Sequence, residues 1–483
     1  MNIWYDVTGL THWNRLQLTG IQRTTVGILN GLLGQGIALK IVHFDLRRGE
    51  FVPLNIAALP ASVRSHINAA AEADLPGSQQ TGEPQRTGES VVAKKRWLSR
   101  TALFGTAPAA DDLRAALRQF KIAGRNLRRH AARWARTRWS PPDLTSPPSP
   151  SVTGLPAGTT APLPSVPPGG EGPFAPGDVL LSLGCTWSMP GHATAAAAAR
   201  HRGIRVLRMI YDLIPAIQPQ WVAPVHTREF TLWARNVLTE SDHVFTISEF
   251  SKREIERYCH ECQFDPPPLS VVRLGDVLSA TEATGPEAPL PRFVPARPFF
   301  VCVSTLDVRK NHRLLYDAWS VLAARDPDAC PDLLCIGTPH LYVDDLLHEI
   351  RHDRAVNGRI HILQSIDDRE LSWYYAHCVA TIYPSRYEGW GLPVAESLGH
   401  GKLCLASHAA SILEISRTLP EFFDPRDPQG LVGLLDRALH DPAWVGERER
   451  LIHESFVPTP WTHTAGQLLT AIDTESSTIP EAA

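Results

Sequence analysis

Short apolar runs alternate with stretches in which apolar residues recur at helical spacing, in two parts of the chain, residues 1–45 and 177–475. Regular alternation of strand and helix predicts parallel sheets with helices on their faces, the α/β class. The chain has 483 residues, too many for one ordinary core, so we expect two such domains. The predicted strands are residues 2–7, 38–44, 178–183, 204–210, 244–247, 269–274, 299–304, 333–337, 360–363, 380–383 and 403–406.

This pattern breaks between the two parts, over an insertion of about residues 50–176. Residues 140–177 are rich in Pro, Ser, Thr and Gly, and this composition predicts a disordered linker or a loose surface loop. The segment from Leu113 to Arg138 carries nine Arg and Lys residues and no acid, and its apolar residues fall near one helical stripe. Such a helix could bind an anionic membrane surface. A solvated helix that packs on the N-terminal domain explains the same pattern equally well. Nucleic acid is a weaker alternative, since no recognition fold accompanies the charge.

Composition and charge are those of a globular protein. Hydrophobic residues make up 43% of the chain, and its formal net charge of −3 does not indicate a nucleic-acid binder. Cysteines lie mostly inside apolar runs, as buried thiols of a reducing compartment do. The N-terminus lacks the regions of a signal peptide, and no window reaches the ~18 apolar residues of a membrane span. We therefore expect a cytoplasmic protein, or one bound peripherally at the inner face of the cytoplasmic membrane.

The best-marked candidate site lies where the apolar run 378–383 gives way to a polar loop, residues 385–391, and then to a helix that begins at Leu392. In α/β proteins, a strand, loop and helix of this kind place backbone N–H groups and a positive helix end at an anion. Glu388 lies in the loop and Glu396 lies one turn into the helix. A carboxylate there would repel a phosphate, so the better role for each is to accept hydrogen bonds from ligand hydroxyls. The pair suits a sugar at one end and a ribose at the other.

Other candidate residues also lie where a predicted strand gives way to a helix. Arg309 and Lys310 follow a strand, and two adjacent cations before a helix N-terminus are unfavourable unless an anion binds there. Gly20 directly precedes the first predicted helix, which begins at Ile21 and contains Arg23. Nucleotide-binding domains approach their ligand at such a place, and a plain helix cap by Thr19 is the alternative. Asp212 ends a strand before a Pro turn, where open α/β sheets bind ligands.

Together these motifs resemble a known family. The residues E-G-W-G-L-P-V-A-E, from Glu388 to Glu396, are similar to the E-x7-E signature of the retaining GT-B glycosyltransferases of the GT4 class, or glycosyl transferase group 1. The stretch from Thr19 to Arg23 resembles the family's T-G-I-x-R opening, and the R-K-N that begins at Arg309 resembles its diphosphate clamp. Y-D-L-I-P resembles the family's H-D-L-I-P with Tyr211 in place of histidine, so a histidine contact to the donor is absent or displaced.

This resemblance implies the GT-B fold, in which two Rossmann-like domains face each other across a cleft. Residues 1–278 would form the N-terminal, acceptor-side domain, which carries the insertion, and residues 279–297 would form the linker. Residues 298–483 would bind the nucleotide sugar, and a closing helix at about residues 461–472 would pack back across the cleft.

The resemblance also implies roles for individual residues. Glu388 would bind donor sugar hydroxyls near the reacting carbon, and Glu396 would bind the ribose. The positive charges of Arg309 and Lys310 would neutralise the leaving diphosphate. Asp212 would be the fourth catalytic residue, beside Glu388, Arg309 and Lys310. The donor site would also include Thr305, Gly389, Gly391 and Leu392. Gly20 and Arg23 would form the loop that meets the acceptor or a phosphate.

The activity implied is retaining transfer of a hexose from a nucleotide-diphosphate sugar to a growing saccharide. By analogy with bacterial surface-polysaccharide transferases the hexose is mannose, and an acceptor on a lipid diphosphate would give the basic insertion a purpose. We expect no cofactor and no obligatory metal, since Arg309 and Lys310 can neutralise the diphosphate. The spacing of Cys259 and Cys262 resembles that of metal ligands, but no second pair lies nearby.

Two other function classes stay open. One is a sugar-nucleotide-binding or scaffolding subunit without turnover, which the substitution at Tyr211 makes conceivable. The other, less favoured, is a sugar-nucleotide epimerase on the same fold, against which the adjacent Arg309 and Lys310 followed by E-x7-E argue.

Deleting residues 113–138 should abolish co-sedimentation of the protein with anionic lipid vesicles, because this segment carries the unbalanced positive charge. Deleting residues 145–170, a segment of equal length without charged residues, is the matched control and should leave co-sedimentation unchanged. Equal sedimentation of the two deletion variants would contradict a membrane role for residues 113–138.

Overall fold

The structure is a computed structural model that describes residues 1–11, 13, 18, 20–67, 172–277 and 291–476. The basic segment from Leu113 to Arg138, most of the Pro-rich stretch and the first part of the expected linker lie outside the described residues.

Seven strands form the first sheet, in the order β3-β2-β1-β4-β5-β6-β7. Neighbouring strands are parallel except β2 and β3. The strands are β1 (Ile3–Asp6), β2 (Leu39–Asp45), β3 (Glu50–Pro53), β4 (Val179–Ser182), β5 (Arg205–Met209), β6 (His243–Thr246) and β7 (Leu269–Val271). The helices of this part are α1 (Gly20–Gly34), α2 (Ala61–Arg64), α5 (His192–His201), α6 (Ile214–Ile217), α7 (Pro224–Thr239) and α8 (Glu249–Glu261).

Six parallel strands form the second sheet, in the order β10-β9-β8-β11-β12-β13. They are β8 (Phe299–Val303), β9 (Asp332–Ile336), β10 (Ile360–Leu363), β11 (Ala380–Tyr383), β12 (Cys404–Ser407) and β13 (Glu421–Phe423). The helices are α9 (His312–Arg325), α10 (Asp344–His352), α11 (Asp368–His377), α12 (Leu392–Gly399), α13 (Pro428–His440), α14 (Pro442–Ser455) and α15 (Trp461–Ser476).

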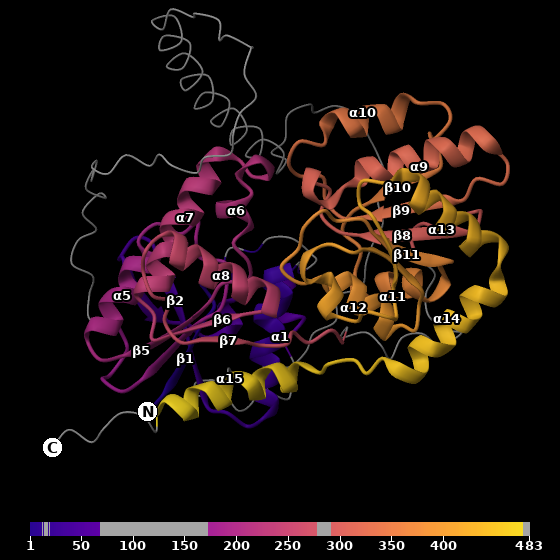
Figure 1. The fold of residues 1–483 in the computed structure, drawn as a ribbon. Coiled ribbons are helices and arrows are strands. Elements are labelled where there is room, and N and C mark those ends of the chain that lie inside the picture. The colour runs from indigo at the N-terminus through magenta and orange to yellow at the C-terminus, as the bar shows by residue number, and fades with distance from the viewer. Residues whose placement is uncertain (12, 14–17, 19, 68–171, 278–290, 477–483) are drawn as a thin grey trace, which may run out of the picture. The chain divides into compact units, whose positions relative to one another are not determined.

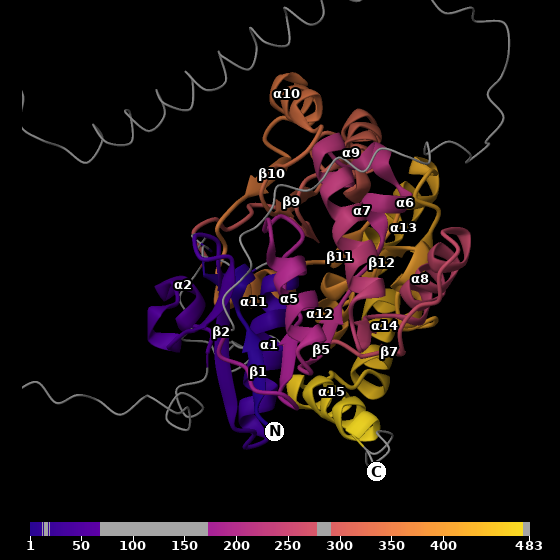
Figure 2. The ribbon, with the colours of Figure 1, turned by 90° about the vertical axis from the view of Figure 1, so that its left-hand side faces the viewer.

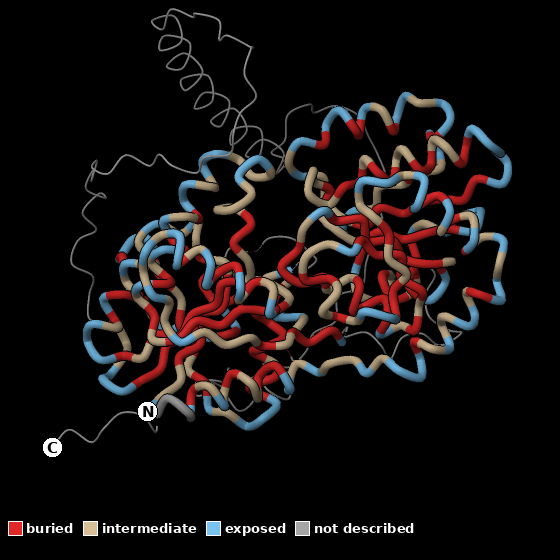
Figure 3. Tube along the Cα trace, viewed as in Figure 1, coloured by how far each residue is buried: buried red, intermediate tan, exposed pale blue. Residues whose placement is uncertain are grey.

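Both sheets are doubly wound, which confirms the two-domain α/β class with Rossmann-like sheets (Figure 1). The strand order reverses between β1 and β4 in the first sheet and between β8 and β11 in the second. Buried residues concentrate along the strands, as expected when helices cover the faces of a parallel sheet (Figure 3). Ligands of such sheets bind outside the carboxyl ends of the strands at the reversal points. A ligand site is therefore expected at the loops that follow these strands.

The sequence analysis missed one strand of the first sheet. β3 lies inside the expected insertion and pairs antiparallel with β2 at the edge of the sheet. Its four residues end in Pro53, which fits an edge strand but hides the strand signal. A short 3-10 helix, Ile56–Ala58, and α2 follow, so regular structure continues well past the point at which the pattern was expected to break.

The C-terminal helix α15 packs against α1 of the first sheet's layer, although α14 before it packs on the second sheet's helices (Figures 1 and 2). Glycines make this close approach possible. A Cβ atom built on Gly31 would lie 2.3 Å from the carbonyl oxygen of Trp461 and 3.0 Å from the Cβ of Ala465. The indole of Trp461 covers Gly27 in the same way. Helix α15 therefore packs on the domain that the N-terminal residues form.

Gly31→Ala should destabilise the protein by about 1–3 kcal/mol, because the added methyl overlaps the α15 backbone. The free energy of unfolding, measured by urea titration, tests this. Gly34→Ala is the control, since its Cβ would meet only the Thr462 methyl at an ordinary 3.7 Å. A loss no larger for Gly31→Ala than for Gly34→Ala would contradict the packing described for α1 and α15.

Candidate functional site

A cavity of about 450 Å³ lies at the carboxyl ends of strands from both sheets. Its size falls within the range of roughly 300–1,000 Å³ typical of small-molecule sites. All eleven candidate residues named from the sequence line it. The structure thus brings together residues that lie up to several hundred positions apart, while the role of each stays a prediction.

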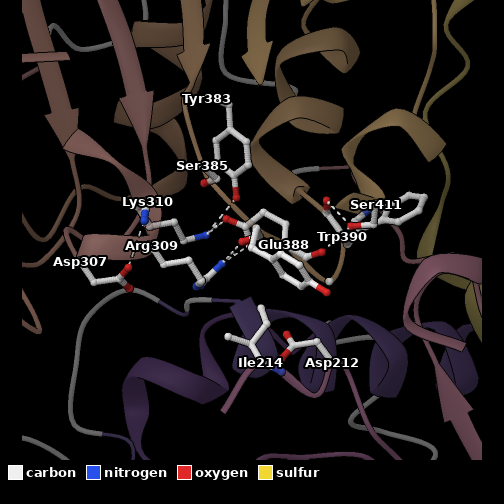
Figure 4. A network of polar contacts seen from close by, with 12 residues as sticks. Asp212, Ile214, Asp307, Arg309, Lys310, Tyr383, Ser385, Glu388, Trp390 and Ser411 are labelled. Carbon is white, nitrogen blue, oxygen red and sulfur yellow. Dashed lines mark hydrogen bonds and ion pairs between the residues drawn. The ribbon is translucent and has the colours of Figure 1, made fainter. Parts of the chain in front are cut away.

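Glu388 holds both candidate cations of this cavity (Figure 4). Its Oε2 lies 2.6 Å from a guanidinium nitrogen of Arg309, and its Oε1 lies 2.6 Å from Nζ of Lys310. Lys310 also donates to the Tyr383 hydroxyl at 3.0 Å. The side chains of the three charged residues are between 8% and 18% exposed, so solvent screens them little. The anion at the two cations in this structure is therefore a protein carboxylate.

A tight turn aims the two cations at the loop of Glu388. Asp307 caps the turn by accepting from the Lys310 backbone N–H at 3.1 Å. Asn311 follows in the left-handed region, with φ of 61°, and its side-chain amide donates to the Pro384 carbonyl at 3.1 Å. Arg309 then reaches the Tyr387 carbonyl at 2.7 Å. Backbone geometry on both sides thus fixes where the charges meet.

The charge cluster shifts the pKa of its members. Burial is the largest influence on Glu388 and raises its pKa, but Arg309 and Lys310 together outweigh burial and hold the pKa at about 2. Burial lowers the pKa of Lys310 despite the attraction of Glu388. For Arg309 the carboxylates outweigh burial, and the pKa rises. Glu388 is consequently an anion at neutral pH.

Glycines in the loop allow its close approach to the first sheet. A Cβ on Gly389 would lie 3.0 Å from Oδ2 of Asp212 and 3.1 Å from the Tyr211 carbonyl oxygen. Gly391, with φ of 138°, immediately precedes α12. Ser411 donates from Oγ to the Glu388 carbonyl at 2.8 Å and supports the loop from the other side (Figure 4).

Glu396 has partners from two other helices. Its Oε1 lies 2.7 Å from a guanidinium nitrogen of Arg23 in the first turn of α1. The other terminal nitrogen of Arg23 lies 2.6 Å from Oδ1 of Asp368, the first residue of α11. Oε2 of Glu396 accepts from the Tyr375 hydroxyl at 3.0 Å. Both carboxylate oxygens thus have a donor.

Asp212 and Tyr211 lie where β5 ends. Asp212 accepts from the Ile214 backbone N–H at 3.0 Å. Burial, the largest influence, raises its pKa, and Glu388 raises it further against the attraction of Arg309 and Lys310. The Tyr211 hydroxyl donates to the Leu183 carbonyl at 2.8 Å, so its polar atom is engaged within the first domain.

Sequence reasoning missed Asp368 and Tyr375 as parts of this site. Asp368 stands beside Asp367, which caps α11 by accepting from the Glu370 N–H at 2.8 Å. A second acid next to a capping acid was a usable signal, since only one of the two is needed for the cap. Tyr375 gave no local signal, because it is one of several apolar and aromatic residues on a buried helix face.

Comparison with known proteins bears on the second domain most directly. A family model described as glycosyl transferases group 1 matches residues 291–456. This match confirms the resemblance that the motifs indicated.

Curated relatives extend the similarity into the first domain. The chain is 26% identical over 234 residues to serotype-specific mannosyltransferase WbdA of Escherichia coli, which covers 46% of this chain and 28% of that protein. It is 25% identical over 255 residues to O-antigen chain mannosyltransferase B of Escherichia coli, with 50% of this chain and 64% of that protein covered. The chain therefore spans less than two thirds of the length of these relatives.

Solved structures with a similar arrangement are more distant in sequence. Sucrose-phosphate synthase from Thermosynechococcus elongatus superposes with a TM-score of 0.48 and 17% identity, covering 62% of this chain and 74% of that one. A trehalose 6-phosphate synthase from Burkholderia multivorans gives 0.48 and 14%, with 64% and 74% covered.

Glu388→Gln should lower the free energy of unfolding at pH 7, on the order of 3 kcal/mol, because it leaves two buried cations without their anion. The folded pKa of about 2 lies below the ordinary 4.5. The contribution is therefore complete above about pH 4.5 and is lost as the pH falls towards 2. Urea unfolding at a series of pH values should show the wild-type and variant curves converging in this window.

Glu349→Gln is the matched control for that series. Glu349 also pairs with an arginine at 2.6 Å, but both side chains are at least 40% exposed, so its loss should have a much smaller effect. A difference between wild type and Glu388→Gln that stays constant from pH 6 to pH 3 would contradict the charge cluster.

Proposed function

We propose that this chain, whose residues 291–456 match glycosyl transferases group 1, transfers a hexosyl group from a nucleotide-diphosphate sugar to a saccharide acceptor. The observation that carries the proposal is the buried pair of cations, Arg309 and Lys310, facing a single carboxylate in a cavity at the N-terminus of α12. Glu388 is the carboxylate in direct contact with both cations, and Asp307 and Asp212 act on Arg309 from further away. The two cations and the helix end are the groups that a phosphate would contact there.

A diphosphate leaving group suits this arrangement. As the bond between the sugar and the diphosphate breaks, negative charge grows on the phosphate oxygens. Arg309 offers a planar fork and Lys310 a point charge, so the two can stabilise that charge together. Glu388, held between them, is placed to accept hydrogen bonds from the sugar hydroxyls once the phosphates take over the cations. Asp212, opposite Gly389, faces the same point from the first domain.

The finer parts of the proposal rest on the family resemblance. Transfer proceeds with retention, on one face of the sugar, and the leaving phosphate takes the acceptor proton, so no separate nucleophile is needed. The hexose is mannose, which the names of the relatives, the serotype-specific mannosyltransferase WbdA and O-antigen chain mannosyltransferase B, support. No obligatory metal takes part, because Arg309 and Lys310 neutralise the diphosphate.

The acceptor we propose is a growing saccharide on a lipid diphosphate, presented at a membrane surface. In the part of the chain that the structure describes, no helix is long and apolar enough to cross a bilayer. Contact with the membrane would fall to the basic segment from Leu113 to Arg138, which lies outside the described residues.

The proposal predicts that one of four donors stabilises the protein and is slowly hydrolysed by it: GDP-mannose, UDP-glucose, UDP-N-acetylglucosamine or dTDP-rhamnose. Thermal shift measures binding, and release of free nucleotide measures turnover. Glu388→Ala should abolish turnover while circular dichroism still shows a folded protein. Glu349→Ala, which removes a paired carboxylate that is not part of the cavity lining, should leave turnover unchanged.

The outcomes separate the competing functions. Binding without turnover, even with lipid-linked acceptors added, would replace the transferase by a sugar-nucleotide-binding subunit. If none of the four donors binds, the proposed donor site is contradicted. Full activity in Glu388→Ala would overturn the role given to that carboxylate.

A further inference from the structure

The ion-pair group Asp368–Arg23–Glu396 is not used by the mechanism proposed above. Arg23 and Glu396 line the cavity, and the three side chains are between 5% and 16% exposed. A cation in the first turn of α1 is unfavourable next to the positive helix end. Its position therefore depends on the two carboxylates that it contacts.

The two contacts of Arg23 are independent of each other. One terminal nitrogen faces Glu396 at 2.7 Å, and the other faces Asp368 at 2.6 Å. The guanidinium can therefore leave Glu396 while it keeps Asp368. Among the described residues, Arg23 is the one cation within 4.0 Å of the Glu396 carboxylate.

Glu396 itself is held in place without Arg23. The buried Tyr375 donates to its Oε2 at 3.0 Å, and the carboxylate lies on the rigid helix α12. If the guanidinium moves away, Oε1 becomes an oriented acceptor at the cavity wall. The family resemblance implies the ribose of the donor nucleotide as the ligand of Glu396, and a ribose hydroxyl can donate to such an oxygen.

We infer that Arg23 occupies Glu396 while the donor is absent and yields this carboxylate to the ribose diol of the donor nucleotide, remaining tethered by Asp368. The inference rests on the proposed function, because it takes the ligand to be a nucleotide diphosphate. It makes Arg23 a positioning residue that competes with the donor for one oxygen. Asp368 lowers the cost of the exchange, because it keeps the displaced guanidinium paired.

The test measures ribose preference, the dissociation constant of 2′,3′-dideoxy-GDP divided by that of GDP, by calorimetry on the full chain. UDP and its dideoxy analogue are measured in parallel, because the base is not assigned. A ratio cancels the effect that any change of cavity charge has on the diphosphate, since both ligands of a pair carry the same phosphates.

Three variants should move this ratio in different directions. Arg23→Gln removes the competitor, so ribose preference should rise about fivefold or more. Asp368→Asn leaves the displaced arginine without a partner, so displacement is harder and ribose preference should fall below that of wild type. Glu396→Gln removes the contested carboxylate, and ribose preference should fall to about one. Circular dichroism checks that each variant folds.

The results are decisive in each case. An unchanged ratio in Arg23→Gln would overturn the inference, because Arg23 and the ribose would then not compete. If Arg23→Gln does not fold, an Asp368→Asn ratio equal to or above that of wild type overturns it instead. If wild type binds neither GDP nor UDP, the proposed function fails and the inference falls with it.

Discussion

The pairing of one buried carboxylate, Glu388, with two cations, Arg309 and Lys310, is the interaction on which the site depends. Each side chain is at most 18% exposed, so each charge has lost most of its hydration. Two contacts of 2.6 Å offset that cost, yet one negative charge cannot balance two positive charges. In direct contact, two cations share one carboxylate, although the cavity lining as a whole has four carboxylates and three cations. The loop after β8 and the loop after β11 are therefore held together by this cluster of charges.

The loops that carry these charges are fixed by backbone contacts between the two domains. Gly389 admits the Asp212 side chain against the loop backbone, where an added Cβ would lie 3.0 Å from it, closer than most Cβ contacts. Glu414 from the second domain accepts hydrogen bonds from the backbone N–H groups of Glu249 and Phe250, at 2.8 and 2.7 Å, and so completes the cap of α8. Ser248 supplies the rest of that cap with its own Oγ. Cap and glycine contact together make the position of Glu388 depend on both sheets.

Features of the fold and of the site were predictable from the sequence where their signal lay within one short stretch of the chain. Most strands of the parallel sheets are buried on both faces, so they appear as continuous apolar runs and were predictable to within a few residues. The three-residue edge strand β13 was missed because it is too short to give such a run. The loop around Glu388 carries its glycines, proline and acid within one short stretch, and was predictable for the same reason. Asp368 gave one local signal, as the second acid beside the capping Asp367, but its pairing with Arg23 was not predictable because the two are 345 positions apart. β3 was also missed, since a short antiparallel edge strand ending in proline has neither length nor alternation.

The cavity contains more negative than positive side chains, although its proposed ligand is an anion. Its lining includes the cations Arg23, Arg309 and Lys310 and the carboxylates Asp212, Asp307, Glu388 and Glu396. The cations are already paired, so a diphosphate gains little unless they change partners. Lys310 and Arg309 would have to share or release Glu388 before a diphosphate could contact them. Exchange of partners, rather than attraction to a vacant positive site, is therefore the physical step by which this cavity would accept the nucleotide sugar that we propose as its ligand.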